Sequence, residues 1–92
     1  MRTIRRTSAF QRDYKREKRG RHRKTLEEEL AKAARMLAAD EPPPRYHDHL
    51  LAGEWKDFRD CHVRPDLVLI YRKPDNATLD LVRLGSHSEL GL

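Results

Sequence analysis

Apolar side chains recur at helical spacing in the first half of the chain. Between residues 26 and 37 they lie three or four positions apart, at Leu26, Leu30, Ala33, Ala34 and Leu37. This spacing places them on one face and predicts an amphipathic helix that closes near Asp40. Thr25 and Glu28 stand three residues apart at its start, which is the spacing of a capping box. Because so small a chain has few other apolar residues to bury, this face is expected to lie in the core.

A shorter helix is predicted closer to the N-terminus. Phe10 and Tyr14 lie four residues apart, and Ser8 with Gln11 has the form of a second capping box. Gly20 is a natural stop for this helix. The preceding run, from residue 2 to residue 7, is expected to form a short strand.

The period changes after the prolines at 42–44. Three runs, at 55–63, 66–72 and 77–85, resemble strands, and turns are indicated at 64–65 and 73–76. The middle run is apolar on both faces, which favours a central strand covered on one side by the helices. The first run does not alternate cleanly and predicts a bulge. Residues 87–92 are long enough for one helical turn.

These elements predict an α+β fold in the order β-α-α-β-β-β with a short C-terminal turn. Two helices would pack on a mainly antiparallel sheet. At 92 residues, without a repeat or a linker, the chain is expected to be a single domain over residues 1–92. The sheet face away from the helices would stay partly open, and side chains could converge there.

Charge is distributed unevenly along this fold. The net charge is +5, yet residues 1–24 hold eleven Lys and Arg against two acidic residues, while the rest of the chain is acidic on balance. Seven of the ten residues from Lys15 to Lys24 are Lys or Arg. Such a run attracts phosphates and makes binding salt-dependent. It favours a nucleic-acid partner over the alternative of a solvated helix end.

Nothing in the sequence indicates a membrane protein or a secreted one. No apolar run approaches the ~20 residues of a membrane span, and the N-terminus lacks the apolar stretch of a secretion signal. We therefore expect a cytoplasmic protein that does not bind a membrane. Cys61 is the single cysteine, which agrees with a reducing compartment, and its thiol is expected to be buried or half-buried.

Three histidines cluster in the stretch "YHDHLLAGEWKDFRDCH", at positions 47, 49 and 62. A zinc site is conceivable here, with Cys61 as a further ligand, but the signal is weak. The chain has no second cysteine and no histidine pair at helical spacing. The sequence therefore predicts no metal and no cofactor.

Cleavage of RNA by acid–base catalysis requires fewer protein groups than a metal site does. The ribose 2′-OH is the nucleophile, so the protein needs only a base, an acid and positive charge for the transition state. The candidates for proton transfer are His49, His62 and His87, and Asp66 could orient an imidazole. The candidate phosphate contacts are Lys56, Arg59 and Arg83. His47 and His22 are taken as surface residues.

Two motifs carry a resemblance to a known family. The run "HDHLLAGEWKDFRDCHVRPDLVLIY", followed by "LVRLGSHSEL", resembles the YafQ-like toxins of the RelE/ParE superfamily, and the likeness covers essentially the whole chain. It implies a RelE-like fold and a metal-independent endoribonuclease that cuts mRNA in the A site of the 30S subunit. It also implies an acidic antitoxin as partner.

Residue by residue, His49, His62, Asp66 and His87 match the catalytic positions of that family. The resemblance implies that His87 is the general acid and that His49 or His62 is the base. The chain departs from the family pattern at two positions. Gly91 stands where the family usually has an aromatic residue, and Leu67 stands where it commonly has tryptophan.

Two alternatives lie in other functional classes. A ParE-like toxin of the same fold would inhibit a protein target such as gyrase, but those relatives lack the histidine set. A small basic module that binds RNA without cutting it would not depend on the histidines at all.

Overall fold

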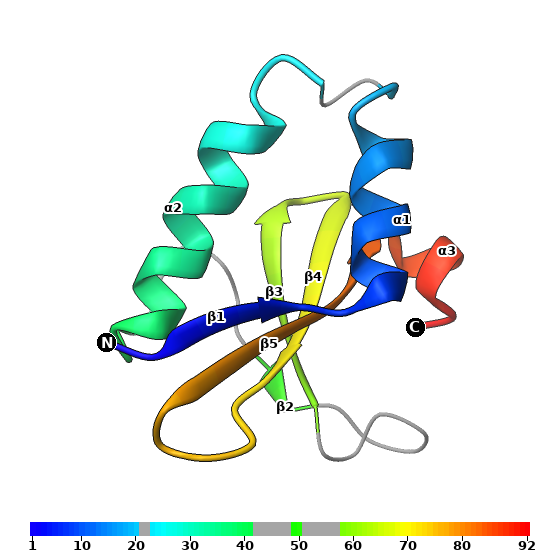
Figure 1. Cartoon of the computed structure of the whole chain (residues 1–92). Coiled ribbons are helices and arrows are strands. Elements are labelled where there is room, and N and C mark those ends of the chain that lie inside the picture. Colours follow the sequence, from blue (N-terminus) through cyan, green and yellow to red (C-terminus); the bar gives the residue numbers. More distant parts are fainter. Residues whose placement is uncertain (21–22, 42–48, 51–57) are drawn as a thin grey trace.

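The computed structural model describes residues 1–20, 23–41, 49–50 and 58–92, with residues 49–50 described by their backbone alone. Its elements are β1 (Thr3–Arg6), α1 (Ser8–Glu17), α2 (Leu26–Ala38), β2 (His49–Leu50), β3 (Arg59–Arg64), β4 (Leu67–Arg72), β5 (Thr78–Gly85) and α3 (His87–Leu90). Figure 1 shows α1 and α2 over one face of the sheet, and α3 following the end of β5.

One sheet organises the described chain. Its strand order is β1-β5-β4-β3-β2, in which β1 runs parallel to β5 and all other neighbours are antiparallel. The strand at the centre is β4, whose residues 67–71 are all buried. The predicted α+β fold, with helices on a mainly antiparallel sheet around an apolar middle strand, is confirmed.

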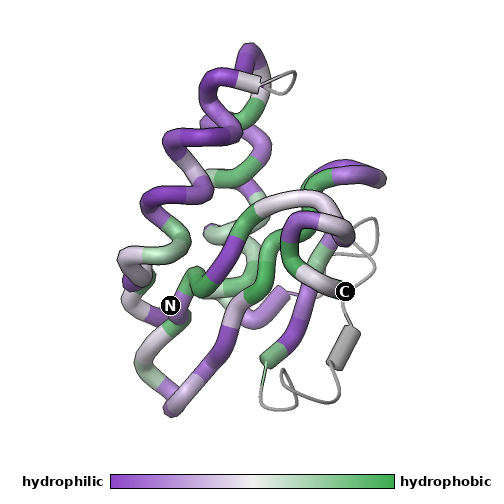
Figure 2. The backbone as a smooth tube through the Cα atoms, turned by 90° about the vertical axis from the view of Figure 1, so that its right-hand side faces the viewer, coloured by the Kyte–Doolittle hydropathy of each residue, from purple (hydrophilic) through white to green (hydrophobic). Residues whose placement is uncertain are grey.

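The two faces of the sheet bury different apolar clusters. On the helix side, Phe10 and the apolar stripe of α2 pack against strand residues that include Cys61, whose thiol is fully buried as predicted. The opposite face carries a smaller cluster of Val68, Ile70 and Leu90. In Figure 2 hydrophilic and hydrophobic colours alternate along both the helices and the sheet. The larger cluster packs α1 and α2 against the sheet, and the smaller one packs α3 against its opposite face.

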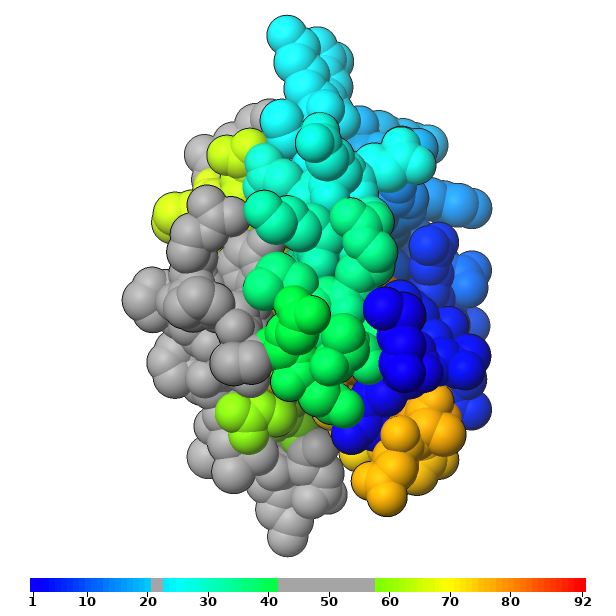
Figure 3. Space-filling view, turned by 90° about the vertical axis from the view of Figure 1, so that its left-hand side faces the viewer, coloured from blue at the N-terminus to red at the C-terminus, as the bar shows by residue number. Residues whose placement is uncertain are grey.

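Helix α2 covers one side of the molecule and contacts the N-terminal strand. The backbone N–H of Arg2 donates to the carbonyl of Ala38 at 2.8 Å. Figure 3 shows α2, coloured cyan to green, in the middle of this side, with β1 in dark blue beside its C-terminal end. Among the described helices, none is both long enough and apolar enough to cross a membrane.

Both helix starts differ from the predicted caps. Thr7 caps α1, because its hydroxyl accepts from the N–H of Phe10 at 3.0 Å; Ser8 is already helical, so the predicted cap was one residue too late. Thr25 does precede α2, but its hydroxyl makes no cap hydrogen bond. It accepts from Arg64 Nη2 at 2.7 Å instead. A tertiary contact therefore replaces the predicted capping box.

The predicted strands are found with small shifts. The runs 66–72 and 77–85 form β4 and β5, and each loses only its first residue. The first run forms β3 from Arg59 onward, and its residues 55–57 lie outside the described chain. The predicted bulge is confirmed by a register shift between His62 and Arg64. The predicted C-terminal turn is α3. Strand β2 was missed, because two residues carry no periodic signal.

An ion-pair cluster on β5 links stability to pH. Asp80 is only 7% exposed and accepts two hydrogen bonds from Arg5, at 2.8 and 3.2 Å. Arg72 Nη2 lies 3.5 Å from the same carboxylate. The hydrogen bond from Arg5 is the main reason why the pKa of Asp80 lies below its ordinary value of 3.8.

We therefore expect the Asp80→Asn variant to be less stable than the parent at neutral pH, with the difference shrinking in acid. A carboxyl whose pKa is lowered by folding stabilises the native state above its unfolded pKa, and this contribution is lost as pH falls through the native pKa. Urea unfolding from about pH 7 to about pH 2 measures both curves. Glu28→Gln, at an exposed site on α2, is the control. A pH-independent difference between parent and Asp80→Asn would contradict this assignment.

Candidate active site

Two of the predicted catalytic histidines meet on the open face of the sheet. His62 lies on β3 next to Cys61, whose side chain enters the helix-side core, so the imidazole projects from the opposite face. His87 is the first residue of α3. Their Nε2 atoms are 3.1 Å apart, and the ring centroids are 5.0 Å apart. Because His62 is half-buried and His87 is exposed, the pair is reachable from solvent.

Asp60 is a third member of this cluster, and the sequence analysis missed it. It is 5% exposed and stands two residues before His62 on β3, hence on the same face of the strand. One carboxylate oxygen of Asp60 and one nitrogen of each histidine all lie within 4.8 Å of one another. The two-residue spacing from His62 was the signal in the sequence.

The other predicted proton-transfer residues lie on neighbouring elements. The backbone of His49 is in β2 and pairs with Asp60 of β3, one strand away from His62. Its side chain lies outside the described part of the structure. Asp66 is half-buried in the turn that joins β3 to β4.

Arg83, predicted as a phosphate contact, holds a buried carboxylate. Its Nε and Nη2 donate to Asp13 of α1 at 2.7 and 3.3 Å, and the backbone N–H of Leu84 donates to the same carboxylate at 2.9 Å. Asp13 is only 4% exposed. Nη1 of Arg83 is not among these donors. Of the other predicted phosphate contacts, Arg59 is half-buried at the start of β3, and Lys56 lies outside the described residues.

A capping box fixes the backbone around His87. The hydroxyl of Ser86 accepts from the N–H of Glu89 at 3.1 Å, and the carboxylate of Glu89 accepts from the N–H of Ser86 at 2.9 Å. That second hydrogen bond lowers the pKa of Glu89. Gly91 follows α3 with a left-handed φ of 72°, a conformation that glycine adopts without strain. Gly91 therefore ends α3.

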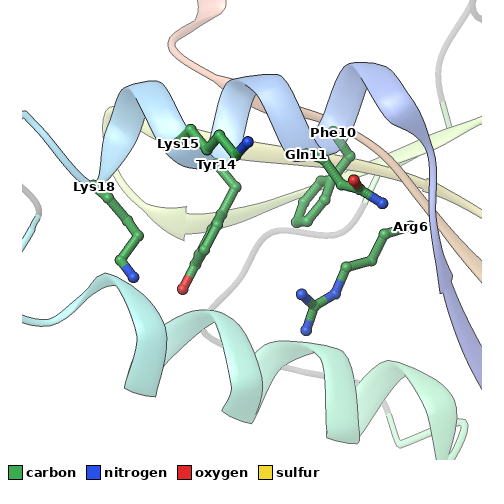
Figure 4. Close-up of a pocket in the computed structure, with 6 residues that line it drawn as sticks. All are labelled: Arg6, Phe10, Gln11, Tyr14, Lys15 and Lys18. Carbon is green, nitrogen blue, oxygen red and sulfur yellow. The ribbon is translucent and has the colours of Figure 1, made fainter.

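A second concave feature lies beside α1, on the side of the sheet opposite to the histidines. This hollow of about 300 Å³ is lined by Arg6, Phe10, Gln11, Tyr14, Lys15 and Lys18. Figure 4 shows Arg6, Tyr14 and Lys18 extending toward α2. Lys18 Nζ lies 5.4 Å from the centroid of the Tyr14 ring. With three cationic side chains around aromatic ones, the hollow suits an anion.

The two histidines lie within hydrogen-bonding distance of each other. A neutral imidazole has one N–H donor and one acceptor nitrogen. At 3.1 Å the two Nε2 atoms can share one hydrogen bond, and the tautomers of the two rings decide which of them donates. Acid–base catalysis near neutral pH needs one group that can give a proton and another that can take one.

Comparison with known proteins gives matches over the whole chain and over half of it. A family model described as "Bacterial toxin of type II toxin-antitoxin system, YafQ" matches residues 2–91. The mRNA interferase toxin YafQ of Escherichia coli K12 is 48% identical over 48 residues, which are 52% of this chain and 51% of that protein. The chain thus spans about half the length of the curated relatives it matches.

Solved structures match over almost the full length. A metal-bound toxin from Helicobacter pylori is 47% identical, with a TM-score of 0.83 over 98% of this chain and 99% of that chain. The toxin in the DinJ–YafQ toxin–antitoxin complex of Escherichia coli is 33% identical, with a TM-score of 0.80 over 97% of this chain and 96% of that chain.

Proposed function

Because the chain belongs to the YafQ family of bacterial toxins from type II toxin–antitoxin systems, we propose that it is an mRNA interferase, an endoribonuclease that cuts mRNA in the ribosomal A site. The family and the RelE-like fold predicted from the sequence motifs are confirmed. The activity, the substrate and the partners are proposed here on the chemistry of the site.

The observation that carries the proposal is the contact between His62 and His87 at 3.1 Å. In the proposed reaction the ribose 2′-oxygen attacks the adjacent phosphorus, and the bond from phosphorus to the 5′-oxygen breaks. One imidazole takes the 2′-OH proton and the other gives a proton to the leaving 5′-oxygen. The products are a 2′,3′-cyclic phosphate and a 5′-hydroxyl, and no metal is required.

Substrate binding has to part the two imidazoles. Each Nε2 must come within about 3 Å of its own oxygen, and the two oxygens lie on opposite sides of the phosphorus. A phosphate therefore cannot fit between nitrogens that touch each other. The exposed His87 is the freer of the two rings, and its swing away from half-buried His62 would admit the phosphate.

The other residues predicted from the sequence are proposed to assist this chemistry. His49 is assigned as an alternative base, and Asp66 as an orienting group. Nη1 of Arg83, together with Arg59 and Lys56, would neutralise the phosphate. The basic hollow beside α1 would contact ribosomal RNA without reading bases. An acidic antitoxin is the expected protein partner, since the YafQ of the solved Escherichia coli complex binds its antitoxin.

A metal ion would compete with the proposed chemistry. Asp60, His62 and His87 offer one carboxylate oxygen and two imidazole nitrogens within 4.8 Å of one another, a donor set that fits zinc or copper. A bound ion would occupy the nitrogens that transfer protons. Metal binding is therefore expected to inhibit this site.

The test is cleavage of a synthetic mRNA on 70S ribosomes at constant Mg²⁺, which the ribosome itself requires, with and without a chelator selective for zinc and copper. Expected are cuts in phase with the reading frame, 2′,3′-cyclic phosphate ends, and the same rate with the chelator. Micromolar Cu²⁺ or Zn²⁺ should lower that rate. Loss of cleavage in the chelator would contradict the metal-independent mechanism. Growth inhibition without any mRNA cuts would favour a toxin that acts on a protein target.

A further inference from the structure

We propose that Arg16 and Glu89 are positioning residues for His87, because together they clamp α3 to α1 and to the end of β5. For its kinetic test this inference rests on the proposed endonuclease function, whereas its spectroscopic test does not. Neither residue touches the reacting atoms, so both would act through the imidazole that they hold in place.

Helix α3 needs such support. It has only four residues, far fewer than a helix that is stable by itself. At one end Leu90 is 5% exposed and packs against Val68 and Ile70. At the other end the capping box of Ser86 and Glu89 holds the start of the helix. His87 lies between these two anchors.

Arg16 connects this capping box to two other elements. Its Nη2 donates to the carbonyl of Leu84 at 2.9 Å, and its Nη1 lies 3.2 Å from the Asp13 carboxylate. Its Nε donates to Oε2 of Glu17 at 3.0 Å and lies 3.3 Å from Oε2 of Glu89. A guanidinium is a rigid planar fork, so one side chain fixes the relative positions of α1, β5 and α3.

Gly85 leaves room for this clamp. A Cβ at this position would stand 2.9 Å from Nη2 of Arg16 and 3.2 Å from Oε1 of Glu89. The guanidinium and the carboxylate therefore pass over a residue without a side chain. Gly85→Ala would push both groups aside without altering any charge, which gives an independent way to loosen the clamp.

The consequence for catalysis follows from the length of α3. With the Ser86 end released, the helix could tilt about Leu90, and the backbone that carries the His87 imidazole would no longer be fixed beside His62. A misplacement of about 1 Å in a catalytic group costs on the order of 100-fold in rate.

The kinetic experiment compares Arg16→Gln, Glu89→Gln and Gly85→Ala with the control Arg12→Gln. Arg12 is an exposed arginine of the same helix, and no ion pair involves it within the described residues. We expect kcat to fall about 10- to 100-fold in the three test variants, with KM within about threefold, and Arg12→Gln to match the parent. Arg16→Lys should recover only part of kcat, since an ammonium cannot bridge all three partners.

The spectroscopic experiment follows the ¹⁵N imidazole signals of His87. In the parent, His62→Gln should shift the Nε2 signal of His87, because it replaces the partner of a direct hydrogen bond. We call this shift the cross-perturbation. It should be smaller when His62→Gln is made in the Gly85→Ala background. A lower stability alone would not reduce it as long as the chain stays folded. Melting curves establish folding. If Arg16→Gln unfolds, the isosteric Glu89→Gln decides.

Two results would overturn the inference. One is a kcat for Gly85→Ala and Glu89→Gln equal to that of Arg12→Gln, and the other is an undiminished cross-perturbation in Gly85→Ala. If the parent cuts no RNA at all, the proposed function fails. The imidazole signals then still decide whether the clamp positions His87.

Discussion

The His87→Gln variant is expected to cut ribosome-bound mRNA about 100 to 10,000 times more slowly than the parent chain. Glutamine is close in size to histidine and can still hydrogen bond to Nε2 of His62, but its amide neither takes nor gives a proton at neutral pH. Since His87 is exposed, its replacement should leave the fold and the melting temperature nearly unchanged. Single-turnover cleavage on ribosomes measures the chemical step directly.

The matched control is His47→Gln, at a histidine that carries no proposed role, and full activity is expected. His62→Gln should resemble His87→Gln. Because the two rings act as a unit, the double variant should fall little below the worse single one. A folded His87→Gln protein that keeps more than about a tenth of the parental rate would exclude His87 as a proton-transfer group.

The largest expected effect on stability comes from the buried carboxylate of Asp13. In Asp13→Ala the guanidinium of Arg83 and the N–H of Leu84 lose their acceptor at a site that is 4% exposed in the parent. Removing one partner of a buried ion pair costs about 3 to 5 kcal/mol, and the partial exposure of Arg83 favours the lower end. A native domain has only about 5 to 15 kcal/mol to lose.

Asp13→Asn should be milder, because its amide oxygen still accepts from one of these donors. Asp40→Asn is the control, since Asp40 forms its ion pairs with Arg2 and Lys73 at an exposed site and asparagine tolerates its left-handed φ of 58°, so only a small change is expected. Urea unfolding at neutral pH gives the three free energies of unfolding. If Asp13→Ala unfolds at the same urea concentration as Asp40→Asn, the carboxylate is not the structural centre that its contacts indicate.

Local patterns were enough to predict most of the fold. The spacing of the leucines and alanines in α2 and the apolar run of β4 act over a few residues, so both elements were predictable. The start of α2 was not, because its cap depends on a distant partner. Thr25 has the sequence of a capping residue, yet its hydroxyl binds Arg64, 39 positions away. Only the folded chain brings that competitor close.

The candidate site was predictable in its parts but not in its arrangement. His62 and His87 could be singled out from residue type and motif, while their contact depends on where β3 and α3 meet. Asp60 was overlooked beside the more prominent Asp66. Arg16 was counted in the basic run of residues 15–24, and its contact with Leu84, 68 positions away, has no local signal. Whether Lys56 and the side chain of His49 join the site stays a prediction.

The parallel pairing of β1 with β5 has a consequence for the order in which the molecule can be completed during its own synthesis. Thr3 of β1 pairs with Thr78 of β5, so β1 cannot join the sheet until β5 has been synthesised. Helices α1 and α2 are likewise synthesised before β3, β4 and β5 (Figure 1). Such distant pairing delays folding. His87 is made later still. A growing chain therefore has no histidine pair until almost the whole described chain has been made.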